Sequence, residues 1–297
     1  MKDLNSPSGL AIAVSEIAEA QLALLDPAKA LARTDEALAL LRDQDTPPKH
    51  LLDYKRASAL AAVGRLADAR RATGDLIKHI DAVQEKPLLG QLHLLNADLD
   101  LAAQKPDSAL ALARQAIEEL SSYDYVRERA LAYRIVARVQ LASAQATDAT
   151  DTVRDLSAWS ASANNPIPAL YALIAQADLA RASQQPDLAR KHYQDALHAA
   201  LAEGVPLDLR AVVTSYGDFL LGENDLAQAG IVIGRLASWT GSDFASALIQ
   251  VRLYHALGQR ESWQSALTEA EGLAGERPIP AALAKPPGHV LSTADGR

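Results

Sequence analysis

The segments PDSALALARQAIE (residues 106–118) and PDLARKHYQDALH (residues 186–198) are two copies of one pattern, 80 residues apart. Each opens with Pro-Asp, has alanine at its fourth position and has a second alanine seven residues later. A step of seven is two helical turns, so both alanines lie on one face of a helix. Proline suits the first helical position, where its missing N–H has no partner to lose. The pattern predicts a helix that packs closely against a neighbour through small residues.

The first alanine of this pattern returns about every forty residues. The series is Ala30, Ala69, Ala109, Ala149, Ala189 and Ala227, with Trp263 in the seventh place. A second column of mostly small residues lies twelve positions earlier, at Ala18, Ala57, Ala97, Ala137, Ala177, Ser215 and Val251. Repetition at this period is typical of stacked helical hairpins. We therefore expect an all-α solenoid of about seven antiparallel helix hairpins.

Turn residues and the two columns place the helices of each hairpin. First helices are expected near 9–24, 50–63, 88–103, 124–143, 166–183, 207–221 and 243–257. Second helices are expected near 27–43, 65–82, 106–120, 147–160, 186–202, 224–239 and 260–274. The domain organisation follows as a lead at 1–8, a repeat domain at 9–275 and a flexible C-terminal tail at 276–297, where the period is lost.

Composition limits the class of protein. The 297 residues are 49% apolar but only 4% aromatic, and this dominance of small and aliphatic residues favours helices over strands. The net charge of −8 argues against direct nucleic-acid binding. Cysteine is absent, which excludes disulfides and thiolate metal sites. With no apparent signal peptide and no apolar stretch near the ~20 residues of a membrane span, we expect a cytoplasmic protein.

Two spacings recur in the turns and in the second helices: Gly64-x4-Ala69 and Gly222-x4-Ala227, and an alanine seven residues after Ala30, Ala109 and Ala189. These spacings resemble those of tetratricopeptide-repeat proteins over about residues 9–275. The period near 40 looks more like the long-repeat variety of bacterial signalling and transcription regulators than the usual 34. The resemblance implies a right-handed superhelix with a concave, ligand-binding groove lined mainly by the first helices.

Two polar faces compete for this groove. One follows directly after the small column and contains Glu19, Ser58, Asp98, Arg138, Asp178, Tyr216 and Arg252. The other contains Arg56, Asn96, Gln176 and Thr214, with Gln21, Asp100, Gln140 and Asp218. The geometry of the resembled family places the first face in the groove, although a solvated face is the simpler alternative for either.

The first helix of the fourth hairpin, expected near 124–143, carries the most specific local feature. Arg127, Arg134 and Arg138 are spaced by 7 and 4, so they share a face, and arginine suits bidentate contacts to carboxylate or phosphate. We expect an anion-binding patch for an acidic peptide, a C-terminal carboxylate or a phosphorylated ligand. Ordinary surface charge is the alternative. The candidate binding residues are Arg134, Arg138, Asp98, Asp178, Arg181, Tyr216 and Arg252.

No catalytic motif stands out. The sequence lacks an HExxH pair, a phosphate-binding GxxxxGK[ST] loop and a GxSxG elbow, so we expect no catalytic residue, metal or cofactor. The expected function is a non-catalytic scaffold that binds a protein or peptide, without direct contact to nucleic acid or membrane. The alternative is a ligand-sensing domain of a larger bacterial transcription regulator or signalling kinase. A homodimer through the end repeats is a further option.

Overall fold

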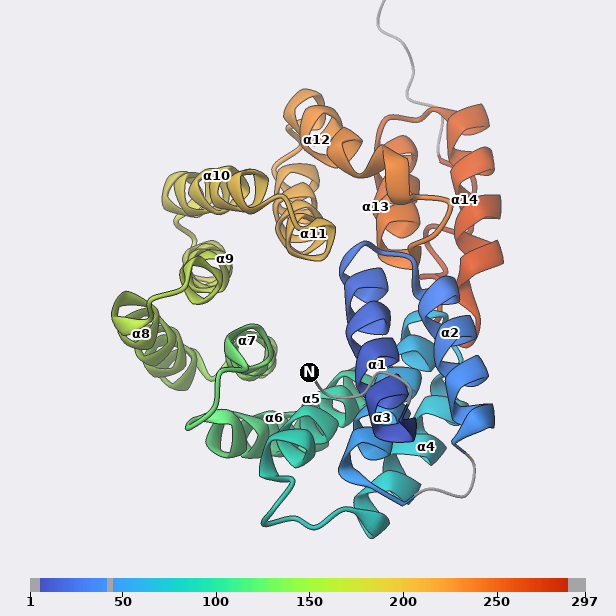
Figure 1. Cartoon of the computed structure of the whole chain (residues 1–297). Helices are drawn as coiled ribbons and strands as arrows, with labels where there is room; N and C mark the ends of the chain where they lie inside the picture. The colour runs from blue at the N-terminus through green and yellow to red at the C-terminus, as the bar shows by residue number, and fades with distance from the viewer. Residues whose placement is uncertain (1–5, 42–44, 288–297) are drawn as a thin grey trace, which may run out of the picture.

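The computed structural model describes residues 6–41 and 45–287, and within them the expected all-α solenoid is confirmed. This part of the chain forms seven antiparallel hairpins, each of an A helix and a B helix, and contains no strand (Figure 1). The A helices are α1 (Pro7–Ala23), α3 (Pro47–Ala62), α5 (Lys86–Ala102), α7 (Val126–Ala142), α9 (Pro166–Ala182), α11 (Pro206–Gly222) and α13 (Phe244–Ala256). The B helices are α2 (Pro27–Leu40), α4 (Leu66–His79), α6 (Pro106–Leu120), α8 (Ala146–Ser162), α10 (Pro186–Glu203), α12 (Leu226–Ile233) and α14 (Arg260–Ala274).

The tight turn between the A and B helix is the same in all seven hairpins. In each turn, the residue just before the N-cap of the B helix has a left-handed backbone conformation. It lies five positions before the repeat alanine or, in the last hairpin, before Trp263. These residues are Leu25, Gly64, Gln104, Ala144, Gln184, Asn224 and Gly258. Five of these residues are not glycine, at a cost of about 1 kcal/mol each. The geometry of the hairpin therefore dictates the turn, and glycine alone is a weak marker of it.

The sixth repeat alanine is Ala229, and the expected Ala227 was wrong. Ala229 is fully buried whereas Ala227 is exposed, so the steps after Ala30 become 39, 40, 40, 40 and 40. The small residue opposite it is Gly217 instead of Ser215, and a Cβ on Gly217 would lie 2.9 Å from the Ile233 side chain. The alanine-rich sequence allowed this slip of two residues because both 227 and 229 are alanine.

The sixth B helix also departs from the expected range. The α-helix α12 stops at Ile233 and continues as a 3₁₀-helix over Gly234–Trp239. Gly230 and Gly234 lie where the regular helix ends, and glycine is the weakest helix former after proline.

The A helices form the inner side of the solenoid and the later B helices its outer side (Figure 1). The largest apolar core lies in hairpins four to six, where Tyr171, Tyr193, Tyr216 and Phe219 are fully buried. Tyr193 and Tyr216 stack with ring centroids 5.3 Å apart. This rigid packing positions the inner faces of α7, α9 and α11.

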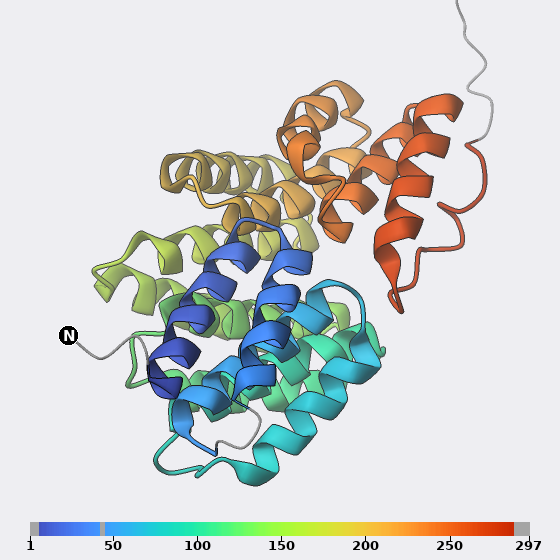
Figure 2. The same ribbon diagram turned by 45° about the vertical axis from the view of Figure 1, so that its right-hand side comes forward.

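The two ends of the solenoid meet and close it into a ring. Helix α1 contacts α11, and the Glu276 N–H donates a hydrogen bond to the Gly64 carbonyl over 2.8 Å. In Figure 2 the last hairpin, in orange to red, lies above and to the right of the first two hairpins, in blue to cyan. Contacts are therefore not confined to successive hairpins, as a simple solenoid would have them.

The C-terminal segment takes part in this closure, contrary to the expected flexible tail at 276–297. The Trp263 indole N–H donates to the Leu283 carbonyl over 2.9 Å, and Ile279 and Leu283 pack against the last hairpin. An apolar surface on the terminal hairpin favours a cover, which residues 276–287 provide. Residues 288–297 of the expected tail and 1–5 of the expected lead lie outside the described residues.

Candidate binding channel

The inner faces of six A helices line a half-open cavity of about 1160 Å³, hereafter the channel. Its wall comes from α3, α5, α7, α9, α11 and α13, and Arg277 adds to it from beyond α14. Pockets for drug-sized ligands usually span roughly 300–1,000 Å³. The channel is therefore large enough for a ligand bigger than a typical metabolite.

Nine charged side chains line the channel, and all are arginine or aspartate. They are Arg134, Arg138, Arg181, Arg210 and Arg277, with Asp98, Asp178, Asp218 and Asp243. Five positive and four negative charges give the lining +1, whereas the whole chain has −8. The lining is therefore nearly balanced in charge, with a slight positive excess that the chain as a whole does not have.

The structure places most of the candidate residues on this lining. Asp98, Arg134, Arg138, Asp178 and Arg181 face the channel from α5, α7 and α9. Tyr216 does not, because it is fully buried and stacked on Tyr193. The column residue of α11 is instead Asp218, which the two-residue slip had assigned to the other face.

Arg252, the last candidate, is not part of the lining. Its Nη1 lies 2.6 Å from Asp218 Oδ1, so Arg252 forms an ion pair with a carboxylate of the lining. A cation that already has a carboxylate partner gains less from a ligand. Arg252 is thus better described as a support of the wall.

Three other lining charges are also held by neighbours. Arg210 Nη1 lies 2.7 Å from Asp243 Oδ1. Asp178 accepts a hydrogen bond from the Tyr193 hydroxyl, and its Oδ2 lies 3.9 Å from Arg134 Nε. Such contacts fix the orientation of side chains that would otherwise sample many rotamers.

Arg134 is one of the most enclosed charges of the channel. Its side chain is 11% exposed, its guanidinium donates to Ser215 Oγ, and its Nε has no hydrogen-bond acceptor among the described residues. Burial lowers its pKa, against the opposing effect of Asp178. A buried donor without an acceptor is energetically costly.

Asp98, Arg138 and Arg181 have no hydrogen-bond or ion-pair partner among the residues that the structure describes. Asp98 reaches the water of the channel but is surrounded by protein, and this desolvation raises its pKa although Arg138, Arg210 and Arg134 act to lower it. These three side chains are the free charges that a ligand would meet.

Arg127 does not join an anion patch with Arg134 and Arg138. Its Nε and Nη2 donate to the two oxygens of the fully buried Asp208, over 3.0 and 2.8 Å. Asp208 also accepts from the Tyr171 hydroxyl over 2.8 Å. These bonds raise the pKa of Arg127, chiefly through the hydrogen bond to Asp208. They join α7, α9 and α11, so the function of Arg127 is structural.

Three residues of the second polar face lie between successive hairpins, whereas Thr214 and Asp218 of that face line the channel. Arg56 contacts Asp35 of α2, Asn96 accepts from Thr73 of α4, and Gln176 donates to Ser157 of α8. In each case the partner lies on the preceding B helix. The polar residues Asp35, Thr73 and Ser157 on those B helices could have indicated from the sequence that this face packs against a neighbouring helix.

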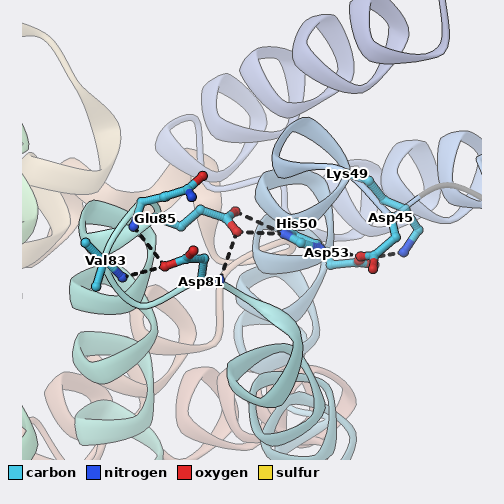
Figure 3. Close-up of polar contacts among 8 residues, drawn as sticks. Asp45, Lys49, His50, Asp53, Asp81, Val83 and Glu85 are labelled. Atoms are coloured by element: carbon cyan, nitrogen blue, oxygen red, sulfur yellow. Dashed lines mark hydrogen bonds and ion pairs between the residues drawn. The ribbon is translucent and has the colours of Figure 1, made fainter.

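A separate titratable cluster lies at the start of α3, away from the channel lining (Figure 3). The buried His50 has its Nδ1 3.0 Å from Glu85 Oε2 and its Nε2 2.8 Å from Asp45 Oδ1. Burial on its own lowers the pKa of His50, but the hydrogen bonds to Asp45 and Glu85 outweigh it and the pKa is raised. Protonated His50 therefore links α3 to the first residues of α5.

Within the described residues, no three histidine, aspartate or glutamate side chains are arranged to hold a metal ion. None of the helices in this part of the chain has the length and apolar character needed to cross a membrane.

Comparisons with known proteins show the fold. No family model matches the sequence, and no curated protein matches it. Among solved structures, a Rap protein complexed with competence and sporulation factor aligns with a TM-score of 0.65 at 12% identity, over 82% of this chain and 69% of that one. PilF of Pseudomonas aeruginosa aligns with a TM-score of 0.43 at 14% identity, over 75% and 91%.

Proposed function

Since the chain has the fold of a tetratricopeptide-like helical-repeat protein, we propose that it is a non-catalytic scaffold that binds a peptide or an extended protein segment in its channel. One observation carries the proposal: the wall of a cavity of about 1160 Å³ presents Asp98, Arg138 and Arg181 without partners. All three side chains are solvent-exposed in the half-open channel, so a ligand of complementary charge pairs with them without first displacing a protein partner.

The free charges indicate the chemistry of the ligand. Two arginines, Arg138 and Arg181, outnumber the single carboxylate of Asp98. A guanidinium binds a carboxylate through two parallel hydrogen bonds. The expected ligand is an acidic segment or a free C-terminus that meets the arginines, with an amino group near Asp98. The bound factor in the Rap structure supports a binding role for this fold.

The wall is organised before any ligand arrives. Ion pairs such as Arg210–Asp243 and the Asp208 network hold neighbouring A helices in place. Little conformational entropy of the protein is then lost on binding, so the ordering cost falls mainly on the peptide.

The hydroxyl groups of the lining support the absence of catalysis. Ser215 receives a hydrogen bond from Arg134, and the Tyr171 hydroxyl donates to Asp208. The lining contains no histidine, lysine or cysteine that could activate either of them as a nucleophile. Dimerisation through the end repeats stays a prediction, and part of that surface is covered by ring closure.

A peptide library tests the proposal. Fluorescent decapeptides of varied charge, each with a free or an amidated C-terminus, would be titrated by fluorescence anisotropy. We expect acidic free-acid peptides to bind, and the Arg138→Ala/Arg181→Ala double variant to lose at least tenfold in affinity. Arg154→Ala, on the outer side in α8 with a side chain 67% exposed, is the matched control and should bind as the parent does. Equal binding by the double variant would overturn the proposal.

A further inference from the structure

Besides the contact of α1 with α11, the ring is closed by three consecutive residues, Gly275, Glu276 and Arg277, which we call the latch. Glu276 donates its N–H to the Gly64 carbonyl over 2.8 Å and accepts at Oε2 from the Ala67 N–H over 2.9 Å. Ala67 lies in the first turn of α4, where amides lack helical acceptors and negative charge is stabilising. Because Arg65 provides no side-chain cap, Glu276 caps α4 from 209 residues away.

Arg277 makes the complementary contact with the ends of two helices. Its Nη1 donates to the Ala62 carbonyl over 2.8 Å, and its other nitrogens donate to Ala274 and Leu273. These carbonyls belong to the last turns of α3 and α14, where positive charge is favoured. The guanidinium also lies 4.4 Å from the centre of the Phe244 ring.

Arg277 lines the channel as well. No described carboxylate lies within ion-pair distance of its guanidinium. Burial lowers its pKa to about 10, with Asp243 acting to raise it and Arg210 to lower it, so the side chain stays charged at neutral pH. With Arg138 and Arg181, it is the third arginine of the channel that lacks a carboxylate partner among the described residues.

Two glycines allow the backbones to approach at the latch. A Cβ on Gly275 would lie 2.6 Å from the Gly64 carbonyl oxygen, and a Cβ on Gly64 would overlap the Ala274 carbonyl. The left-handed backbone does not itself require glycine at 64, because five equivalent turns hold other residues. Glycine at 64 is explained by the close approach to the latch.

We propose that the latch holds the superhelix as a closed ring and sets the shape of the channel, with Arg277 acting in both the latch and the binding site. The second part rests on the proposed function. A ligand that pairs with Arg277 in the closed ring stabilises closure, and by linkage closure raises the affinity for that ligand equally.

Ring closure can be measured without a ligand. The chain has no cysteine, so spin labels at Arg71→Cys in α4 and Glu271→Cys in α14 report the distance across the latch by pulsed electron resonance. The test variants are Gly64→Ala and Glu276→Ala; the latter is exposed and leaves the cores intact. The control is Gly204→Ala, which has a similar positive φ but no atom within 4 Å of the added Cβ.

We expect a narrow distance distribution for the parent and for Gly204→Ala. At least half of the population should shift to longer distances in Gly64→Ala, with a smaller shift in Glu276→Ala. If Gly64→Ala does not fold, Glu276→Ala decides alone. Parent-like distances in every folded latch variant, or equal opening in Gly204→Ala, would overturn the latch.

The link between latch and channel needs an acidic decapeptide selected on the parent. Glu276→Ala should bind it at least fivefold more weakly, although Glu276 does not line the channel. Unchanged affinity in an opened ring would overturn the coupling. If the parent binds no peptide, the proposed function fails, and the distance measurement still decides whether the latch exists.

Discussion

The wall of the channel and the latch hold the ring together in different ways. The wall from α7 to α11 is built by neighbouring A helices and by the Asp208 network across them. The latch joins residues that are 209 to 215 positions apart in the sequence, and it consists of Gly275–Arg277 in contact with the turn between α3 and α4. The wall results from a packing unit repeated locally, whereas the latch depends on the summed rotation of all the hairpins. Stability should therefore lie mainly in the wall, and control of shape in the latch.

Breaking the wall should give the largest effect. Asp208→Ala leaves Arg127 without its buried carboxylate and Tyr171 without its acceptor. Removing one partner of a buried pair costs about 3–5 kcal/mol, and we expect a loss of about 3 because Arg127 is partly exposed. Urea denaturation measures it. Arg154→Ala, which removes an exposed pair, should change stability by less than about 0.5 kcal/mol. Equal losses would mean that Asp208 does not brace the wall.

The repeat spacing of the wall can be tested in the sixth hairpin. Ala229→Leu forces extra atoms into a closed helix crossing and should cost about 1–3 kcal/mol. Ala227→Leu, two residues earlier and exposed, should stay within about 0.5 kcal/mol of the parent. The reverse order in thermal or urea unfolding would restore the register first expected from the sequence.

Weakening the latch should cost less stability than damage to the wall. Glu276→Ala removes the cap of α4, and loss of an N-cap costs typically about 1 kcal/mol. Hydrogen exchange should rise in the first turn of α4 while the protection of α9 and α10 stays unchanged. Faster exchange throughout the ring would show that latch and wall unfold together.

The smallest effect concerns pH. The raised pKa of His50 means that its contribution is present below the unfolded pKa of about 6.5 and is lost as pH rises through the folded value. The difference in unfolding midpoint between the parent and His50→Gln should therefore shrink from pH 5.5 to 8.5. His198→Gln, at an exposed position in α10 with no hydrogen-bond or ion-pair partner among the described residues, is the control variant. A difference that grows with pH would contradict the bridge to Asp45 and Glu85.

Most of the channel wall could be predicted from the sequence because the wall is formed by contacts within and between neighbouring hairpins. The alanine columns placed the hairpins, and the polar column brought Asp98, Arg138 and Asp178 to the channel. The prediction was wrong at Ala227, where equal side chains offered two registers, and Tyr216 was misplaced with it.

The latch and the Asp208 network could not be predicted from the sequence. Arg127 shares a face with Arg134, yet only the packing of α11 supplies its buried partner. Glu276 and Arg277 lie where the period has ended, and no spacing relates them to Ala62 and Ala67. Contacts of this kind depend on the curvature of the whole solenoid.

Hydrogen exchange of two backbone amides, measured by nuclear magnetic resonance, tests ring closure most directly. The Ala67 N–H donates to Glu276, and the Glu276 N–H donates to Gly64, so a closed ring protects both. First-turn amides of α6 and α10, at Asp107 and Asp187, serve as the unprotected reference. We predict exchange of Ala67 and Glu276 at least tenfold slower than the reference. Exchange of both at the reference rate would mean that the ends do not meet in solution.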